Sequence, residues 1–211
     1  MKLYYSPFAC SLATHIALRE AGLDVSLARI DLASKRVDDG TDLRLVNPMG
    51  QVPTLVTDDG LVLTENGTVL TWVGDRVPER ALVPSPTSQE RYELTRWLSF
   101  VATEVHKKGL ALVFDPISPE EVKTYARNGL ARPLGRLEQL LSERDYLVGS
   151  QFTVADAYLF WALTIAPHGG VPLDGYPALR AYHARILERP AVRAAVRYER
   201  DQRETATNVS P

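Results

Sequence analysis

The sequence predicts two domains of different class, a small mixed α/β domain followed by an all-helical domain. Three observations support this division: strand and helix patterns alternate in residues 1–77, a proline-rich linker follows at 78–86, and strand patterns are absent from 87–200. The polar residues 201–211 are expected to fray. The chain has 211 residues, 45% of them apolar, which is enough to form the cores of two small domains.

Strand and helix patterns follow one another in the first domain. The expected strands cover residues 3–5, 25–32, 54–57 and 61–63, and the expected helices cover 11–22 and 66–77. The order strand, helix, strand predicts a parallel pair joined by a right-handed crossover. Turn residues at 58–60 predict an antiparallel hairpin.

Helical spacing of apolar residues recurs in the second domain, with prolines and glycines between the segments. The expected helices cover 88–113, 119–142, 153–166, 177–188 and 190–199. Thr153 and Asp156 form the pattern of a capping box in front of one helix. We therefore expect Asp156 to stabilise that helix start rather than to take part in catalysis.

Charge balance and cysteine content limit the function classes. Lys and Arg number 24 against 26 Asp and Glu, a net charge of -2, which argues against a nucleic-acid binder or a membrane-surface protein. A signal-peptide core and a membrane span of ~18 apolar residues are both missing from the sequence, so a cytoplasmic location is expected. The single cysteine excludes an internal disulfide and a thiolate-rich metal site, and we expect no metal.

Cys10 falls between a strand that ends near Tyr5 and a helix that begins near Ser11. Unpaired backbone N–H groups and the positive end of the helix dipole stabilise a thiolate at such a position and lower the cysteine pKa. The position therefore favours a reactive cysteine. A buried, inert thiol is the alternative.

Two further positions could receive an extended peptide ligand. Pro53 stands just before a hairpin strand, where a cis bond to Val52 would turn the Val52 backbone outward to pair with a peptide; an ordinary strand-start proline is the alternative. Asn66, after Glu65, is expected to cap a helix that starts near Gly67. The N-terminus of that helix could receive a carboxylate, although capping alone also explains Asn66.

A polar row is expected on the helix at 88–113, on a face different from its apolar stripe. At about 100° per residue, Ser99, Thr103 and His106 cluster there, beside Lys107. The row is either a solvated surface or part of a site.

Several blocks of sequence together resemble one family. They are MKLYYSP and ACSL within residues 1–12, HIALREAG at 15–22, VNP and GQVP within 46–53, LTE at 63–65, ATEVHK at 102–107 and FTVADAYLF at 152–160. These blocks resemble the glutathione transferases, and within them the bacterial beta class, over nearly all of residues 1–200. The resemblance implies the glutathione transferase fold, in which an α/β thioredoxin-like N-terminal domain precedes an all-α C-terminal domain.

The resemblance also implies an activity. The family activates the glutathione thiol for attack on small electrophiles or disulfides, with glutathione as co-substrate. It further implies a role in detoxification and a homodimer. The alternative is a glutathione-binding or partner-binding protein of the same fold with little turnover, because a fold does not guarantee its chemistry.

Residue roles follow from the resemblance at matching positions. The implied catalytic residues are Cys10, which lies beside the glutathione sulfur and can form a mixed disulfide with it, and His106. Lys35 is implied to reach the glycyl carboxylate, the Val52 backbone to pair with the cysteinyl part, and Glu65 with its neighbour to hold the γ-glutamyl end. Pro53 is implied to be a cis-proline. The full set of implied glutathione-binding residues is Tyr5, Ser11, Lys35, Gln51, Val52, Pro53, Glu65, Asn66, Ser99, Thr103 and Lys107.

Four positions depart from the family pattern. Phe8 stands where the family usually has glycine, Met49 replaces a lysine, Asn66 replaces serine or glycine, and Ser99 replaces an asparagine. Phe8 places an aromatic ring close to Cys10. We therefore expect Phe8 to line the electrophile pocket and to make it narrower, more apolar or suited to a different substrate.

Overall fold

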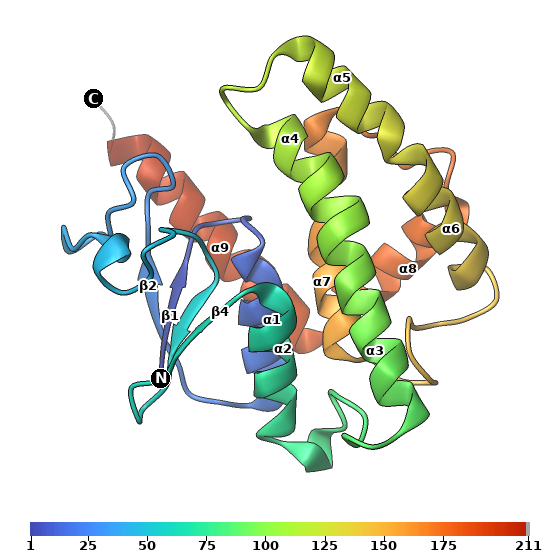
Figure 1. Ribbon diagram of the computed structural model, residues 1–211, viewed down its shortest axis with the longest axis horizontal. Helices are drawn as coiled ribbons and strands as arrows, with labels where there is room; N and C mark the ends of the chain where they lie inside the picture. Colours follow the sequence, from blue (N-terminus) through green and yellow to red (C-terminus); the bar gives the residue numbers. More distant parts are fainter. Residues whose placement is uncertain (210–211) are drawn as a thin grey trace. The chain divides into compact units, whose positions relative to one another are not determined.

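The computed structural model describes the backbone of residues 1–209 and the side chains of residues 1–205. It divides into two compact units, drawn in Figure 1: one joins Met1–Leu82 with the chain from Arg189 onward, and the other is Val83–Glu188. The first boundary falls within the range 78–86. The second boundary differs from the expected division, because residues 189–200 pack with the first unit and not with the helical one.

The first unit is built on a four-stranded mixed sheet in the order β2-β1-β3-β4. β1 (Lys2–Tyr5) pairs in parallel with β2 (Ser26–Arg29) and antiparallel with β3 (Thr54–Val56). β3 pairs antiparallel with β4 (Val62–Thr64). The parallel pair and the hairpin predicted from the sequence are confirmed.

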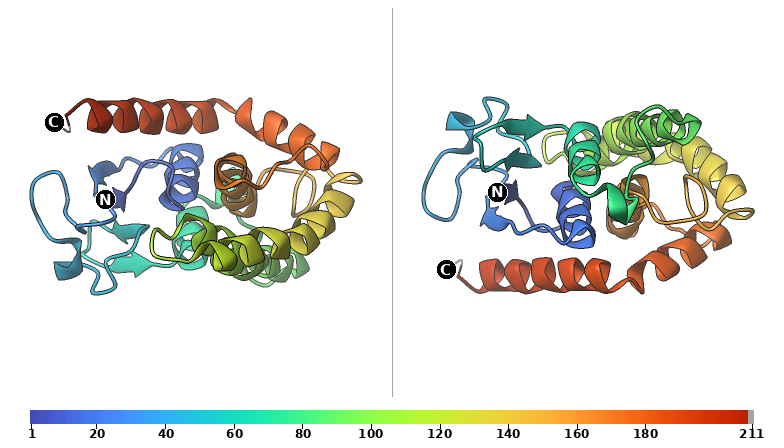
Figure 2. Two further views of the ribbon diagram at one scale, coloured as in Figure 1. Left: turned by 90° about the horizontal axis from the view of Figure 1, so that it is seen from above. Right: turned by 90° about the horizontal axis from the view of Figure 1, so that it is seen from below.

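Three helices belong to this unit, with α1 (Ser11–Ala21) between α2 (Asn66–Asp75) and α9 (Pro190–Val209) in both views of Figure 2. α1 ends at Gly22, whose φ of 68° lies in the left-handed region that glycine adopts without strain. Short 3₁₀ turns occur at Leu43–Leu45 and Pro78–Arg80.

α9 runs through most of the segment 201–211 and ends at Val209, and the fraying expected there stays a prediction. Residues 210 and 211 lie outside the described part of the chain. After Pro190 the helix contains no proline or glycine to end it. Arg29 in β2 also donates a hydrogen bond to the carbonyl of Gln202 at 3.0 Å, which ties this part of α9 to the sheet.

The second unit is helical throughout its regular structure, as predicted. Its elements are α3 (Gln89–Phe100), a π-helix (Val101–Leu110), α4 (Ala111–Phe114), α5 (Glu120–Gly129), α6 (Ala131–Leu141), α7 (Val154–Ile165), a 3₁₀ turn (Ala166–Gly169) and α8 (Pro177–Leu187). Nearly every residue of α7 is buried, which makes it the core helix of this unit. Among the described residues, no helix combines the length and apolar character needed to cross a bilayer.

Two predicted helices differ in detail. The segment 88–113 contains a ten-residue π-helix between α3 and α4. The segment 119–142 is two helices that meet at Leu130, because Pro133 has no N–H to donate to the carbonyl of Gly129.

The capping box predicted at the start of α7 is present, and it is larger than the sequence pattern implies. The fully buried carboxylate of Asp156 accepts hydrogen bonds from the Thr153 N–H at 2.8 Å and the Thr153 hydroxyl at 3.0 Å. It also accepts from the Leu147 N–H at 2.9 Å and the Tyr182 hydroxyl at 2.8 Å. Asp156 therefore connects α7 with the preceding loop and with α8.

Candidate functional site

Residues 6–11 form a closed loop, the Cys10 loop, which holds Cys10 at the N-terminus of α1. The Ser6 N–H donates to the Ser11 hydroxyl at 3.2 Å, the Ser11 hydroxyl donates to the Ser6 carbonyl at 3.3 Å, and the Ala9 N–H donates to the same carbonyl at 3.0 Å. Cys10 is the N-cap residue and is half-buried. The predicted helix-start position of Cys10 is therefore confirmed, and the fully buried Ser11 closes the loop that carries it.

The segment before β3 brings its backbone to the Cys10 sulfur. The Cys10 thiol donates to the Val52 carbonyl at 3.1 Å, and the Val52–Pro53 peptide bond is cis, as predicted. The Asn47 amide donates to the Gln51 carbonyl at 3.0 Å and to the Thr54 hydroxyl at 2.9 Å, which holds the segment in place. Among the residues that the structure describes, no acceptor pairs with the Val52 N–H. One donor beside Cys10 is thus available to a ligand.

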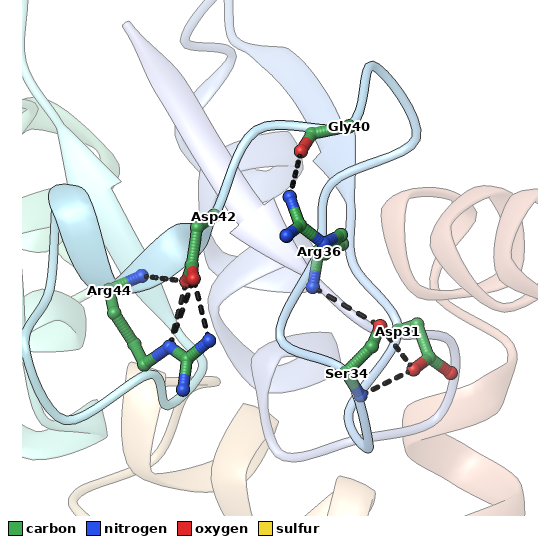
Figure 3. Close-up of polar contacts among 6 residues, drawn as sticks. All are labelled: Asp31, Ser34, Arg36, Gly40, Asp42 and Arg44. Atoms are coloured by element: carbon green, nitrogen blue, oxygen red, sulfur yellow. Dashed lines mark hydrogen bonds and ion pairs between the residues drawn. The ribbon is translucent and has the colours of Figure 1, made fainter.

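Lys35 lies in a loop that its own polar contacts hold together (Figure 3). These contacts join Asp31 with Ser34, Ser34 with Arg36, Arg36 with Gly40, and Asp42 with Arg44. The aliphatic part of Lys35 passes Gly50, where a Cβ would meet the Lys35 Cγ and Cδ at 3.4 Å. The loop therefore brings the Lys35 side chain beside the segment that carries Gln51 and Val52, with Gln51 exposed.

Glu65, and not Asn66, occupies the N-cap position of α2, so the predicted Asn66 cap is wrong. Asn66 is the first helical residue, and its buried amide oxygen accepts from the Thr14 hydroxyl at 3.2 Å. Because the chain enters the helix through Glu65 at a φ of 64°, Asn66 turns toward α1. No described side chain caps this helix start, which leaves its N–H groups available to an anion.

Left-handed backbone conformations mark the same positions. Within the described part of the chain, four residues other than glycine have such a φ. Three of them are predicted site residues: Phe8 at 59°, Lys35 at 63° and Glu65 at 64°; the fourth is Ala81. Such conformations persist only where the surroundings enforce them, and they concentrate at binding and active sites. Backbone geometry thus supports the site independently of the sequence motifs.

Tyr5, by contrast, belongs to the core of this unit. Its side chain is 1% exposed, and its ring packs against His15 and Tyr198. Burial, reinforced by a hydrogen bond with Tyr198, raises the pKa of its hydroxyl. Tyr5 is therefore a core residue of this unit, and its implied contact with glutathione stays a prediction.

Glu199 was not expected from the sequence. Its buried carboxylate, on α9, accepts from the Phe8 N–H at 2.7 Å and contacts His15 Nδ1 at 3.0 Å. Burial raises the pKa of this carboxyl. One signal could have found it, since Val192, Ala195, Val196 and Glu199 follow helical spacing and all four are buried. A carboxylate on the apolar stripe of a helix indicates a buried partner.

The polar row predicted on the helix at 88–113 is only partly present. Ser99 and Thr103 are exposed and the Thr103 hydroxyl donates to the Ser99 carbonyl at 3.0 Å, but His106 turns inward onto α7. The row breaks because the π-helix that contains Thr103 and His106 has a wider turn than an α-helix. Lys107 is exposed.

His106 packs within the helical unit. Its Nδ1 lies 2.8 Å from the Tyr158 hydroxyl, and its ring stands edge-on to Trp161 with centroids 4.6 Å apart. Burial, with a smaller contribution from Lys107, lowers the pKa of His106 to about 4, so its imidazole is neutral at neutral pH. Because these residues belong to the other compact unit, the roles predicted for them in glutathione binding stay predictions.

In the part of the chain that the structure describes, no group of three or more His, Cys, Asp and Glu side chains has the arrangement of a metal site.

Comparisons with known proteins cover both units. Residues 5–76 match the family described as glutathione S-transferase, N-terminal domain, and residues 100–190 match glutathione S-transferase, C-terminal domain. The glutathione S-transferase GstA of Escherichia coli O157:H7 is 43% identical over 199 residues, which cover 94% of this chain and 98% of that protein.

Two solved structures extend the similarity to three dimensions. A sphingomonad glutathione S-transferase in complex with glutathione is 42% identical, with a TM-score of 0.91. A bacterial beta-class glutathione S-transferase of Sphingomonas chungbukensis is 44% identical, also with a TM-score of 0.91. Each comparison covers 94% of this chain and 98% of the other.

Proposed function

The chain belongs to the glutathione S-transferase family, in its bacterial beta class, and from that premise we propose that it activates the glutathione thiol for attack on small electrophiles or disulfides at a site around Cys10. The observation that carries the proposal is the Cys10 sulfur, which lies at the N-terminus of α1 and 3.1 Å from the Val52 carbonyl. The similar sphingomonad structure contains glutathione, which supports glutathione as the co-substrate here.

Three contacts along the 50–54 segment suit an extended tripeptide. Lys35 passes Gly50, Cys10 contacts Val52, and Thr54 pairs with Thr64, which immediately precedes Glu65. Four residue steps span at most about 14 Å, which is enough for a ligand of three residues. Glutathione would place its glycyl carboxylate toward Lys35 and its cysteinyl backbone along Val52. Its γ-glutamyl end would lie at Glu65, with its ammonium group toward the Glu65 carboxylate and its carboxylate toward the uncapped start of α2.

Binding at Val52 also changes the state of Cys10. The Cys10 thiol donates a hydrogen bond to the Val52 carbonyl, and the cysteinyl N–H of a bound glutathione would compete for that carbonyl oxygen. Once displaced, the thiol can ionise, because the N-terminus of α1 stabilises a thiolate.

Two reactions then become available. In disulfide exchange, the Cys10 thiolate attacks a disulfide sulfur, a new S–S bond forms, and the other sulfur leaves as a thiolate; glutathione then resolves the mixed disulfide. In conjugation, the glutathione thiolate attacks an electrophilic carbon and the leaving group departs with the bonding electron pair.

Mass spectrometry tests the thiol site. Incubation of the native protein with oxidised glutathione should add one glutathionyl group, which dithiothreitol removes. Cys10→Ala should lose that adduct and most disulfide-exchange activity but keep most of its affinity for glutathione. A protein that reacts only after unfolding would contradict the role of Cys10.

Kinetics test the transferase proposal against its alternative. The purified protein should turn over an aromatic halide or a small disulfide with glutathione. Glutathione binding without turnover of either substrate would indicate a binding protein of the same fold.

The glycyl end is tested by charge removal. Lys35→Met should raise the KM for glutathione about tenfold, because a cation that pairs with a carboxylate is lost. Arg36→Met is the matched control, since the Arg36 guanidinium donates to the Gly40 carbonyl at 2.7 Å. Equal effects of the two variants would contradict the assignment.

The proposal includes a homodimer, a cytoplasmic location and a role in detoxification. Sedimentation should give twice the chain mass of 23.4 kDa at micromolar concentration. A monomer with full activity would contradict the dimer.

A further inference from the structure

Glu199 reaches the Cys10 loop from the far end of the chain, and the transfer chemistry proposed above does not use it. Its Oε2 accepts from the Phe8 N–H at 2.7 Å, across 191 positions of sequence. The side chain is 0% exposed. A carboxylate so deeply buried is stable only with good hydrogen bonds, so this contact is part of a specific arrangement.

Phe8 requires such support. Its φ of 59° lies in the left-handed region, where a side chain with a Cβ is strained, and the family resemblance places glycine at this position. A hydrogen bond from a backbone N–H to a carboxylate is roughly twice as strong as one between neutral groups. The Glu199 carboxylate can therefore hold the Phe8 backbone in a conformation that its side chain disfavours.

A chain of hydrogen bonds fixes the carboxylate in turn. Arg19 Nε donates to His15 Nε2 at 2.9 Å, so the His15 proton is on Nδ1 and is donated to Glu199 Oε1 at 3.0 Å. Among the described residues, the other charged or titratable groups in this region include Tyr198 on α9, Tyr5 on β1 with Arg29 on β2, and Arg203, which lies over the Phe8 ring. With two directed partners, the Glu199 carboxylate has one orientation.

We infer that Glu199 is a positioning residue for Cys10. By holding the Phe8 N–H it sets the turn that places the Cys10 sulfur at the N-terminus of α1 and against the Val52 carbonyl. The inference rests on the proposed role of Cys10. Through Glu199, α9 would help to set the position and reactivity of Cys10.

A second carboxylate supplies a matched control. Glu20 on α1 pairs with Arg189, just before α9, through contacts of 2.6 and 2.8 Å. Like the contact between His15 and Glu199, this pair joins α1 to the chain end that contains α9. Glu20, however, lies ten residues from Cys10, about 15 Å along the helix. Glu199→Gln and Glu20→Gln therefore make the same chemical change, and only the first touches the Cys10 loop.

The measurement is the rate of Cys10 alkylation by iodoacetamide in the native protein across pH 5 to 10. The Phe8 N–H and His15 Nδ1 reach different oxygens of Glu199, and glutamine replaces one of these oxygens with an NH₂ group that only donates, so one of the two hydrogen bonds is lost. Glu199→Gln should slow alkylation at pH 7 about tenfold and move the midpoint of the pH profile upward. Glu20→Gln should lower the melting temperature and leave the profile unchanged.

A second substitution tests whether Glu199→Gln acts by moving the Cys10 loop or by destabilising the whole protein. Glycine adopts a left-handed φ without support, so adding Phe8→Gly to Glu199→Gln should restore the alkylation profile. If Glu199→Gln does not fold, Glu199→Asp, which keeps the charge and shortens its reach, should shift the profile in the same direction.

Equal profiles for wild type and Glu199→Gln, equal shifts for Glu199→Gln and Glu20→Gln, or no rescue by Phe8→Gly would each overturn the inference. Glutathione turnover on the same samples tests the proposed function separately, because alkylation reports on Cys10 whether or not the protein transfers glutathione.

Discussion

Asp156 and Glu199 are both fully buried carboxylates, one in each compact unit, and they differ in how far their partners lie along the chain. Three of the hydrogen bonds to Asp156 come from Thr153 and Leu147, at most nine residues away. The partners of Glu199 are 184 and 191 residues away.

This difference separates two uses of a buried charge. Around Asp156 the donors belong to a helix start and to the elements that pack on it, so the carboxylate stabilises local structure. Around Glu199 the donors belong to the first helix and to the Cys10 loop, so the carboxylate joins distant segments. Burial raises the pKa of both groups, and only their partners tell their roles apart.

The largest effect on stability is expected at Asp156. Asp156→Ala should lower the free energy of unfolding by ~3 to 5 kcal/mol, because it leaves several buried donors without an acceptor. A capping box alone would account for only about 1 kcal/mol. Urea unfolding measures the loss, and Asp145→Ala, at an exposed carboxylate beside Arg185, is the control with little effect.

Cys10 alkylation completes that test. The folded Asp156→Ala protein should alkylate at the wild-type rate, because Asp156 has no bond to the Cys10 loop. A slower rate with unchanged stability would reverse the roles assigned to the two carboxylates.

The next effect is a dependence of stability on pH. The folded-state pKa of His106, about 4, lies below the 6.5 of an exposed histidine, so the unfolded chain binds the proton more tightly. The stability that His106 contributes is therefore full above pH 6.5 and is lost as the pH falls toward 4. The raised pKa values of Asp156 and Glu199 act in the opposite direction, because there the folded chain holds the proton more tightly.

Unfolding free energies measured from pH 7 to 4 test whether the contribution of His106 to stability falls on acidification. His106→Gln should flatten the loss of stability on acidification, whereas His168→Gln, at an exposed histidine of the same unit, should leave it unchanged. Equal slopes for wild type and His106→Gln would contradict the buried, neutral state of His106.

What the sequence could predict follows the same division between near and distant partners. The hairpin and the capping box depend on residues a few positions apart, and both are present. The placement of α9 and the contacts of Glu199 depend on packing between the two ends of the chain, which local spacing does not contain.

The errors within the site have an equally physical origin. Asparagine is a residue type that often occupies the N-cap of a helix. Here Glu65, with its left-handed φ, occupies the N-cap of α2, and Asn66 turns toward Thr14. His106 was placed by α-helical spacing, and the π-helix moved it to another face. In both cases a backbone conformation that residue type does not specify decided where the side chain lies.

A smaller effect is expected from a single hydroxyl in the helical unit. Tyr182→Phe removes one donor to Asp156 and keeps the ring in place, so it should lower the free energy of unfolding by about 1 kcal/mol. Tyr198→Phe, which loses a neutral hydrogen bond to Tyr5, is the counterpart in the other unit and should lose less. A larger loss at Tyr198 would show that the Glu199 region also carries much of the stability.

The smallest change in stability is expected at Phe8, where two effects oppose each other. Phe8→Gly removes left-handed strain of ~1 to 2 kcal/mol, while glycine gives the unfolded chain extra entropy that is worth ~0.5 to 1 kcal/mol. The loss of the ring beside Arg203 reduces the gain further. The free energy of unfolding should therefore change by less than ~1 kcal/mol.

Phe8→Gly should change substrate preference even though it changes the free energy of unfolding little. The ring is two residues from Cys10, whereas the groups proposed to pair with glutathione lie on the 50–54 segment and at Glu65. Phe8→Gly should therefore change kcat/KM for bulky and small electrophiles by different factors, with little change in the KM for glutathione. A uniform change for every electrophile would indicate that Phe8 acts only through the backbone that Glu199 holds, and the ring would then have no part in substrate choice.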